Sequence, residues 1–299
     1  MDTWKSREWN SSIDPVVTRC APSPTGYLHL GHVVNAIYVW GIAGARGGDV
    51  LLRIEDHDRI RSRPEFEVAL LEDLEWLGFV PGGLKASGYR LQCYRQSDHD
   101  KVYEQALAAL RRTHHVYACD CSRKDIGGEQ YPGTCRDRHL AEGAGRGLRV
   151  EIAPGIERFV DARLGPQEQS PAGQCGDLLL RDRDGHWTYQ FAVTVDDHRD
   201  GVTHVIRGAD LLSSTGRQMR LARMLGRVAP PAFLHHPILL NAAGEKMSKS
   251  SGDTGVRELR EAGVPAEEVI GRAAHAAGLI DRVRPVAASQ VHQLFGGAA

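Results

Sequence analysis

The sequence contains no long hydrophobic run and no large excess of charge of either sign. None of its apolar stretches approaches the length of a transmembrane helix, and residues 1–13 are polar, without the apolar region of a signal peptide. We therefore expect neither a membrane protein nor a secreted one. The formal net charge is −1 at pH 7, so contact with nucleic acid would depend on local basic patches rather than on an overall basic field.

Internal repeats and low-complexity segments are also absent, and the cysteines are not distributed as in a disulfide scaffold. Three of the six cysteines lie between Cys119 and Cys135, a spacing that does not suggest a secreted protein. We expect a monomer in the reducing cytoplasm, with no membrane partner. A length of 299 residues, of which 41% are hydrophobic, allows one or two domains with a sizeable core.

Residues 15–112 alternate short apolar runs with helical periodicity, which predicts an α/β fold. The β-branched run at 16–18 and the apolar run at 50–54 indicate buried strands. Apolar residues recur at helical spacing over 64–77 and 98–112. This order is typical of the first half of a Rossmann-like nucleotide-binding domain.

The pattern changes after this region. Cysteines, glycines and short strand-like runs dominate residues 113–185, which indicates an inserted subdomain. The α/β pattern returns over 186–253, with a predicted helix at 214–225 and a predicted strand at 238–240. Residues 254–299 are expected to form a short helical C-terminal region.

The first candidate for chemistry is the start of the helix that follows the first strand. A loop with two prolines and a glycine leads into His29-Leu30-Gly31-His32. A helix N-terminus offers unpaired N–H groups and positive potential, and Gly31 lets a ligand approach the backbone. Both imidazoles lie on one helix face, so both could bind one phosphate chain. Alternatively, the two histidines are capping or surface residues.

The second candidate is Lys246-Met247-Ser248-Lys249-Ser250, a basic loop between two glycines. Its ammonium groups suit the negative charge that develops on a departing pyrophosphate. Alternatively, it is an ordinary solvated run of charge.

Together the two stretches resemble the signatures of class I aminoacyl-tRNA synthetases, His-x-Gly-His and Lys-Met-Ser-Lys-Ser. The longer stretch from Arg19 to Gly31, followed by residues 53–56 (Arg-Ile-Glu-Asp), is similar to the glutamyl branch. The resemblance covers residues 16–253. It implies a class I synthetase fold with an inserted, zinc-containing, acceptor-type subdomain. Cys20 departs from the family pattern, where an aromatic residue is more usual, and we expect it to affect packing rather than chemistry.

Three charged residues fit an amino acid with an acidic side chain. Arg19 and Glu55 follow strands, at the edge where open α/β sheets place their ligands, and Arg207 follows the predicted strand-like run at 203–206. Arginine can hold a carboxylate through two hydrogen bonds, and a carboxylate can hold an ammonium group. Alternatively, Glu55 forms a structural ion-pair cluster with Arg53 and Asp56.

The resemblance also implies roles for individual residues. The glutamate site would comprise Arg19, Ala21, Ser23, Glu55, Tyr189 and Arg207. The ATP site would comprise Pro22, Thr25, Gly26, His29, Gly31, His32, Asp210 and Lys249. The catalytic residues would be His29, His32, Lys246 and Lys249. The implied reaction is attack of a glutamate carboxylate on the α-phosphate of ATP, which is supplied with magnesium, to give an acyl-adenylate.

Three cysteines are spaced as in a structural zinc site: Cys119, Cys121 and Cys135. Thiolates are preferred zinc ligands, and structural sites have four ligands. The pattern Cys-x-Cys-x9-Tyr-x3-Cys resembles the zinc site of some glutamyl-type enzymes, which implies Tyr131 as the fourth ligand. His139 and Cys175 are other candidates, and the cysteines could instead be free buried thiols.

The segment after the lysine loop bears on the acceptor. Only the 49 residues 251–299 follow Ser250, too few for the helical anticodon-binding domain of full glutamyl-tRNA synthetases. We therefore expect the chain to resemble the glutamyl-type enzymes that transfer glutamate to queuosine in the anticodon loop of tRNA(Asp). The alternatives are a glutamyl-tRNA synthetase that charges the tRNA 3′ end, a small-molecule adenylyltransferase, and a non-catalytic RNA- or metal-binding module.

Overall fold

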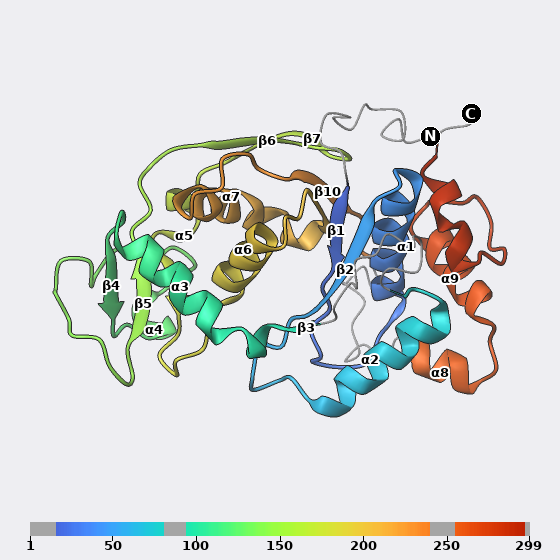
Figure 1. The fold of residues 1–299 in the computed structure, drawn as a ribbon, viewed down its shortest axis with the longest axis horizontal. Helices are drawn as coiled ribbons and strands as arrows, with labels where there is room; N and C mark the ends of the chain where they lie inside the picture. The colour runs from blue at the N-terminus through green and yellow to red at the C-terminus, as the bar shows by residue number, and fades with distance from the viewer. Residues whose placement is uncertain (1–15, 81–93, 240–254, 297–299) are drawn as a thin grey trace.

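Two sheets with parallel strands form the middle of the molecule (Figure 1). The computed structural model describes residues 16–80, 94–239 and 255–296. The first sheet has the order β1 (Val17–Cys20), β2 (Asp49–Ile54) and β3 (Tyr94–Arg95), all parallel. The second sheet has the order β7 (Gly165–Gln169), β6 (Glu157–Asp161), β10 (Ala232–His236) and β9 (His204–Gly208), in which only the β6–β7 pair is antiparallel.

The two sheets are joined at one end of β1 and separate at the other. The Thr203 backbone N–H, just before β9, donates to the Val17 carbonyl at 2.9 Å, and the Val17 N–H donates to Thr203 Oγ1 at 2.8 Å. Toward the carboxyl ends the strands are bridged by a side chain, because Arg19 Nη1 donates to the Ile206 carbonyl at 3.2 Å. β2 lies beside β1 on one side, and β9 lies beside β1 on the other. The position where neighbouring strands diverge in this way is called a topological switch point, and open α/β sheets bind ligands there.

Helix α1 (Leu30–Ala45) lies between these two sheets and the C-terminal helices (Figure 1). It contacts β1, β2 and β9 on one side, and α9 (Ala266–Ala276) and the 3₁₀ helix η5 (Ala288–Leu294) on the other. Its middle is therefore almost wholly apolar and buried. A Cβ at Gly41 would overlap the Phe295 ring, so the close approach of η5 requires glycine there.

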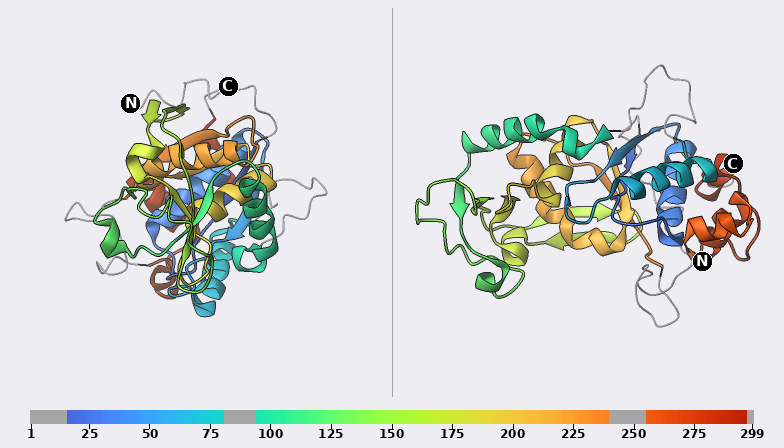
Figure 2. Two further views of the ribbon diagram at one scale, coloured as in Figure 1. Left: turned by 90° about the vertical axis from the view of Figure 1, so that its left-hand side faces the viewer. Right: turned by 90° about the horizontal axis from the view of Figure 1, so that it is seen from below.

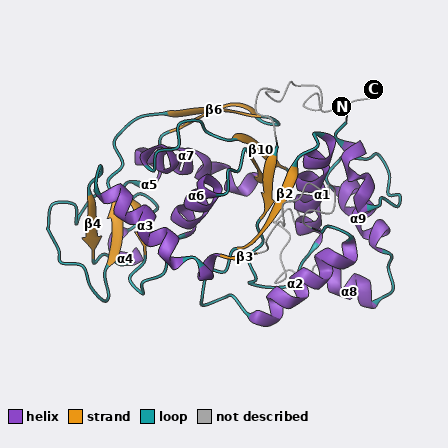
Figure 3. Ribbon diagram, in the orientation of Figure 1, coloured by secondary structure: helices purple, strands orange, loops and turns teal. Residues whose placement is uncertain are grey.

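The remaining helices surround the two sheets and helix α1 (Figure 3). α2 (Pro64–Leu77) begins with proline and ends at Gly78, which has a φ of +85°, and it contacts α9. η2 (Gln96–Asp98), α6 (Tyr189–Arg199), η3 (Ala209–Ser214) and α7 (Thr215–Met224) lie nearer the two sheets. α3 (Asp100–Arg111) contacts α6, and α8 (Val256–Glu261) contacts α9. No helix of the described segments is both long enough and apolar enough to cross a lipid bilayer.

A third, antiparallel sheet forms the end of the molecule opposite α9 (Figures 1 and 2). It contains β4 (Val116–Cys119), β5 (Gly147–Val150) and β8 (Leu178–Arg181), and the short helices α4 (Arg123–Ile126) and α5 (Pro171–Cys175) belong to the same region. Its hydrophobic cluster includes Leu148, Leu180 and Phe191. Residues 113–185 thus contribute to two sheets, because the β6–β7 hairpin pairs with β10 near the switch point.

The helices predicted over 64–77, 98–112 and 214–225 are confirmed within two residues at each end, as α2, α3 and α7. The strand predicted over 238–240 is wrong at Ile238 and Leu239, which are not in a strand, and Leu240 lies outside the described residues. The strand in this part of the chain is β10. Its last two residues are histidines, so the hydrophobicity pattern does not indicate a buried strand there. Ile238 and Leu239 instead line the cavity described below.

A buried carboxyl on α2 predicts an unusual dependence of stability on pH. Asp73 is buried, its Oδ2 accepts no hydrogen bond from the described residues, and Arg260 Nη1 lies 3.8 Å from its Oδ1. Burial raises the pKa of Asp73 to about 6, against the smaller opposing effect of Arg260. The folded protein therefore holds this proton more tightly than the unfolded chain, so the carboxyl's contribution to stability falls as pH rises from about 4 to about 6.

Asp73→Asn should accordingly raise the melting temperature by several degrees at pH 7.5, and the gain should vanish near pH 4. Thermal melts at both pH values measure this, with Glu75→Gln on the exposed face of α2 as the control. A melting temperature of Asp73→Asn no higher than that of the wild type at pH 7.5 would contradict the assignment.

Candidate functional site

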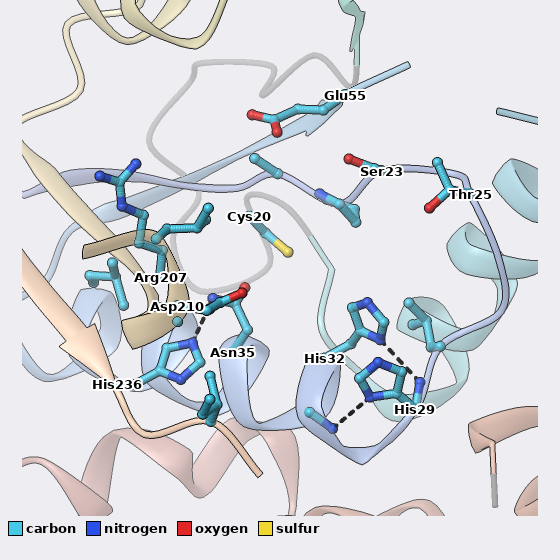
Figure 4. Close-up of a pocket in the computed structure, with 18 of the residues that line it drawn as sticks. Cys20, Ser23, Thr25, His29, His32, Asn35, Glu55, Arg207, Asp210 and His236 are labelled. Carbon is cyan, nitrogen blue, oxygen red and sulfur yellow. Dashed lines mark hydrogen bonds between the residues drawn. The ribbon is translucent and has the colours of Figure 1, made fainter. Parts of the chain in front are cut away.

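A cavity of about 510 Å³ opens at the switch point between β1 and β9 (Figure 4). Its size is typical of a site for small molecules. The sequence-predicted residues that line it are Arg19, Ala21, Pro22, Ser23, Thr25, His29, Gly31, His32, Glu55, Tyr189, Arg207 and Asp210. Gly26 belongs to the same loop but does not line the cavity. Lys246 and Lys249 lie outside the described residues.

The two histidines at the start of α1 cap the helix and also face the cavity. His29 Nδ1 accepts a hydrogen bond from the Gly31 N–H, and His32 Nδ1 accepts one from the His29 N–H, both at 3.1 Å. Because each Nδ1 is an acceptor, the proton of each neutral ring is on Nε2, which is then a donor. The capping alternative and the phosphate-site prediction are therefore compatible, since the capped rings retain N–H groups that can donate to an anion.

One buried carboxylate bridges two buried arginines beneath the cavity. Asp197 Oδ1 lies 3.0 Å from Arg19 Nε and 2.7 Å from Arg53 Nη1. Burial acts to raise the pKa of Asp197, but Arg19 and Arg53 together lower it below its ordinary value. The carboxyl is thus ionised and compensates part of the charge of both guanidinium groups.

Glu55 belongs both to this ion-pair cluster and to the cavity wall (Figure 4). Its Oε1 accepts a hydrogen bond from Arg53 Nη2 at 2.8 Å, and its backbone N–H donates to the Pro22 carbonyl at 3.0 Å. The predicted alternative of a structural ion-pair cluster therefore holds for Arg53 and Glu55. Asp56 is not part of it, because its carboxylate instead accepts from the Ser97 N–H at 2.9 Å.

Arg207 is buried in the cavity wall, and its guanidinium makes no hydrogen bond to a carboxylate of the described residues. Its guanidinium donates to His235 Nε2 at 3.1 Å, to Thr215 Oγ1 at 2.8 Å and to Gln218 Oε1 at 2.7 Å, all neutral acceptors. It forms no ion pair with any residue of the described segments. Burial lowers the pKa of Arg207, yet arginine stays protonated in proteins. This part of the cavity is therefore suited to an anion.

Several lining residues were missed by the sequence patterns. His236 Nε2 lies 3.0 Å from Asn35 Nδ2 beside Asp210 (Figure 4), and its Nδ1 lies 2.9 Å from the Pro237 carbonyl. Burial lowers the pKa of His236 to about 4, so this ring is neutral and accepts from Asn35. The position of Asn35, one turn after His32 on α1, could have indicated that Asn35 lines the cavity. His57 could have been found in the same way, because it is two residues after Glu55. No sequence pattern indicated His236.

The predicted zinc ligands come together at the C-terminal end of β4. The Sγ atoms of Cys119, Cys121 and Cys135 all lie within 4.8 Å of one another, with Cys121 and Cys135 3.5 Å apart. Tyr131 Oη lies 3.4 Å from Cys119 Sγ and accepts a hydrogen bond from the Cys135 N–H at 2.8 Å. Zinc–sulfur bonds of about 2.3 Å in a tetrahedron separate sulfurs by about 3.8 Å, so the donor set fits one zinc ion.

An arginine next to one of these thiols, Cys119, favours the thiolate form that zinc requires. Arg149 Nε lies 3.4 Å from Cys119 Sγ, and the guanidinium stands 3.8 Å above the Tyr131 ring. Although burial acts to raise it, the contacts with Tyr131 and Arg149 lower the pKa of the Cys119 thiol. Neither rival for the fourth position joins the cluster: His139 is not among the grouped ligands, and Cys175 Sγ lies 3.1 Å from the Pro171 carbonyl.

The family model and the relatives of known sequence point to the same family. Residues 15–276 match the family model described as tRNA synthetases class I (E and Q), catalytic domain. A glutamyl-Q tRNA(Asp) synthetase of Nitratidesulfovibrio vulgaris is 41% identical over 280 residues, covering 88% of this chain and 86% of that protein. One of Symbiobacterium thermophilum is 39% identical over 296 residues, covering 93% and 91%.

Solved structures extend the likeness to the fold. The glutamate-tRNA synthetase of Elizabethkingia anophelis superposes with a TM-score of 0.76 at 27% identity. A glutamate tRNA ligase of Elizabethkingia meningosepticum, solved with its amino acid, gives 0.76 at 28%. These matches cover 94% and 93% of this chain but only 66% and 64% of the two solved chains, just under two thirds of their length.

Removing the carboxylate of Asp197 tests how much its contacts with the two arginines stabilise the fold. Asp197→Asn keeps the shape of the side chain but leaves the buried charges of Arg19 and Arg53 less compensated, which should lower the free energy of unfolding by about 3 kcal/mol. Urea denaturation measures the change. The control is Glu168→Gln, which breaks an exposed ion pair with Arg158 and should cost less than about 1 kcal/mol. Equal losses in the two variants would show that the bridge is not a stabilising element.

Proposed function

Because this chain belongs to the glutamyl-Q tRNA(Asp) synthetases of the class I glutamyl and glutaminyl tRNA synthetase family, we propose that it activates L-glutamate with ATP and transfers the glutamyl group to queuosine in the anticodon loop of tRNA(Asp). The observation that carries this proposal is the charge of the cavity. Two buried arginines and one carboxylate converge there beside a helix start with two imidazole donors.

Glutamate presents two carboxylates and one ammonium group. In the proposed complex, Arg207 and Arg19 hold the carboxylates, and Glu55 holds the ammonium group. Arg207 contributes most of the attraction, since Asp197 already compensates part of the charge of Arg19. Tyr189 adds a hydroxyl, because burial raises the pKa of its phenol and keeps it protonated, and Ala21 and Ser23 complete the wall.

ATP would lie against the start of α1. His29 and His32 donate to its phosphates there, and Pro22, Thr25, Gly31 and Asp210 supply the remaining contacts from the cavity wall. Gly26, which does not line the cavity, would serve only to shape the loop. Magnesium accompanies the phosphates, and Lys246 and Lys249 stabilise the departing pyrophosphate. The glutamate carboxylate attacks the α-phosphate, which forms the acyl-adenylate and releases pyrophosphate. The protein supplies no nucleophile, so its contribution is positioning and electrostatic stabilisation.

The proposed acceptor is supported by the relatives. Those named glutamyl-Q tRNA(Asp) synthetase are 39% and 41% identical and are matched over most of their length. The second candidate, charging of the tRNA 3′ end, is favoured by the fold likeness to glutamate-tRNA synthetases at 27% and 28% identity. The two candidates share the activation step and differ only in the acceptor.

Two measurements test the steps separately. The protein should catalyse glutamate-dependent ATP–pyrophosphate exchange without tRNA, and it should then load glutamate onto tRNA(Asp) that contains queuosine. The matched control is the unmodified transcript of the same tRNA, which should remain unloaded. Loading of the terminal adenosine of that transcript would establish the second candidate. An absence of exchange both with and without tRNA would reject both candidates.

We also propose a structural zinc ion held by Cys119, Cys121, Cys135 and Tyr131. When bound, it would fix the loop after β4 to the segment that contains Cys135, away from the cavity. Purified protein should contain about one zinc per chain, and Cys135→Ser should lose it together with several degrees of melting temperature. Cys175→Ser, at a cysteine outside the cluster, is the control and should retain the metal. A zinc content of Cys135→Ser equal to that of the control would refute the site.

A further inference from the structure

We propose that His235 is a positioning residue for the amino-acid substrate: with Asp161 behind it, it orients the Arg207 guanidinium without neutralising it. The inference rests on the proposed function, because it takes Arg207 to bind a carboxylate of glutamate. Neither His235 nor Asp161 lines the cavity, so both would act through Arg207.

Asp161, His235 and Arg207 form a buried chain of hydrogen bonds across the neighbouring strands β6, β10 and β9. Asp161, at the end of β6, and His235, on β10, have no exposed surface. Asp161 Oδ2 lies 2.6 Å from His235 Nδ1 and accepts from the His235 backbone N–H at 3.0 Å. On the opposite edge of the ring, His235 Nε2 accepts from Arg207 Nε at 3.1 Å.

Asp161 contacts Nδ1 of the ring, whereas Arg207 Nε and Thr215 Oγ1, each 3.1 Å away, contact Nε2, and all three agree with one tautomer. Arginine Nε is always a donor, so His235 Nε2 must be an unprotonated acceptor. The Asp161 carboxylate is an acceptor, so the proton of the ring is on Nδ1. Burial lowers the pKa of His235, which agrees with a neutral ring despite the nearby carboxylate.

A neutral acceptor has an advantage over a carboxylate at this position. Arg19 is paired directly with Asp197, so part of its charge is already compensated. A carboxylate bonded directly to Arg207 would likewise compete with the carboxylate of the substrate for the same guanidinium. The imidazole instead fixes Nε while the compensating acid stands on the far side of the ring, so Arg207 keeps its charge for the ligand.

The other two guanidinium nitrogens are held in the same way. Thr215 Oγ1 accepts from Nη2 and Gln218 Oε1 accepts from Nη1, and the Gln218 amide donates to Gln190 Oε1 at 2.9 Å. Arg207 is therefore fixed on three sides by uncharged groups before any ligand arrives. Such preorganisation reduces the entropy that binding would otherwise cost.

A matched pair of substitutions separates orientation of Arg207 from support of the fold. His235→Asn places an amide N–H near the position of Nδ1, so it keeps the bond to Asp161 and loses the acceptor for Arg207. His235→Gln places an amide oxygen near the position of Nε2, so it keeps the acceptor and loses the donor to Asp161. Asp161 itself is less suitable, because its Oδ1 also accepts from the Arg163 and Leu164 N–H groups in the hairpin turn.

Glutamate affinity is measured by calorimetry, and the KM values for glutamate and ATP are measured by pyrophosphate exchange. His235→Asn should weaken glutamate binding about tenfold or more, whereas His235→Gln should stay within about threefold of the wild type. The KM for ATP should stay within about twofold in both variants, and saturating glutamate should restore most of kcat in His235→Asn. Thermal melts should rank the variants in the opposite order, because His235→Gln leaves the buried Asp161 carboxylate short of a donor.

His204→Asn, at a buried histidine of β9 outside the cavity, is the control and should leave glutamate affinity unchanged. Equal glutamate affinities in the two His235 variants, or losses that follow the melting temperatures, would overturn the inference. Calorimetry keeps it distinct from the proposed function: wild-type protein that binds glutamate without catalysing exchange would refute the function alone. Wild-type protein that does not bind glutamate would refute both.

Discussion

The ion pair on which the site depends is the contact of Asp197 with Arg19 and Arg53. The two sheets part at the carboxyl ends of β1 and β9, and this opening is filled by guanidinium groups rather than by backbone hydrogen bonds. Burying two such cations is unfavourable unless an anion lies between them. Because Asp197 is on α6, the helix after the third sheet, it fixes this helix to β1 and β2 of the first sheet.

The cavity wall therefore contains two differently supported arginines. Arg19 is held by an acid and serves as much to close the sheet as to face a ligand. Arg207 is held by an imidazole, a hydroxyl and an amide, and it retains its charge. Together with Glu55 they give one site with the charges that an acidic amino acid complements. The imidazoles at the start of α1 add the donors that a phosphate chain requires.

Much of the site could be predicted from the sequence, because its residues belong to local patterns. Arg19, His29 and His32 belong to one strand–loop–helix unit, and Glu55 directly follows the next strand, so each could be placed at the edge of the sheet from its element. Their partners could not be predicted in this way. Asp197 is 178 residues from Arg19 in the chain, and Asp161 is 74 from His235, so only the tertiary fold reveals these contacts. β10 was missed for a different reason: its histidines are polar in sequence but buried in the structure.

The capping geometry at α1 links the shape of the helix to its ligand. While both Nδ1 atoms accept backbone N–H groups of the same turn, the rings of His29 and His32 are held side by side with their protons on Nε2. Unwinding that turn would release the rings and separate the paired donors. Any anion that accepts from both imidazoles consequently stabilises the first turn of the helix by mass action, so the folding of this turn and occupancy of the cavity are one coupled equilibrium.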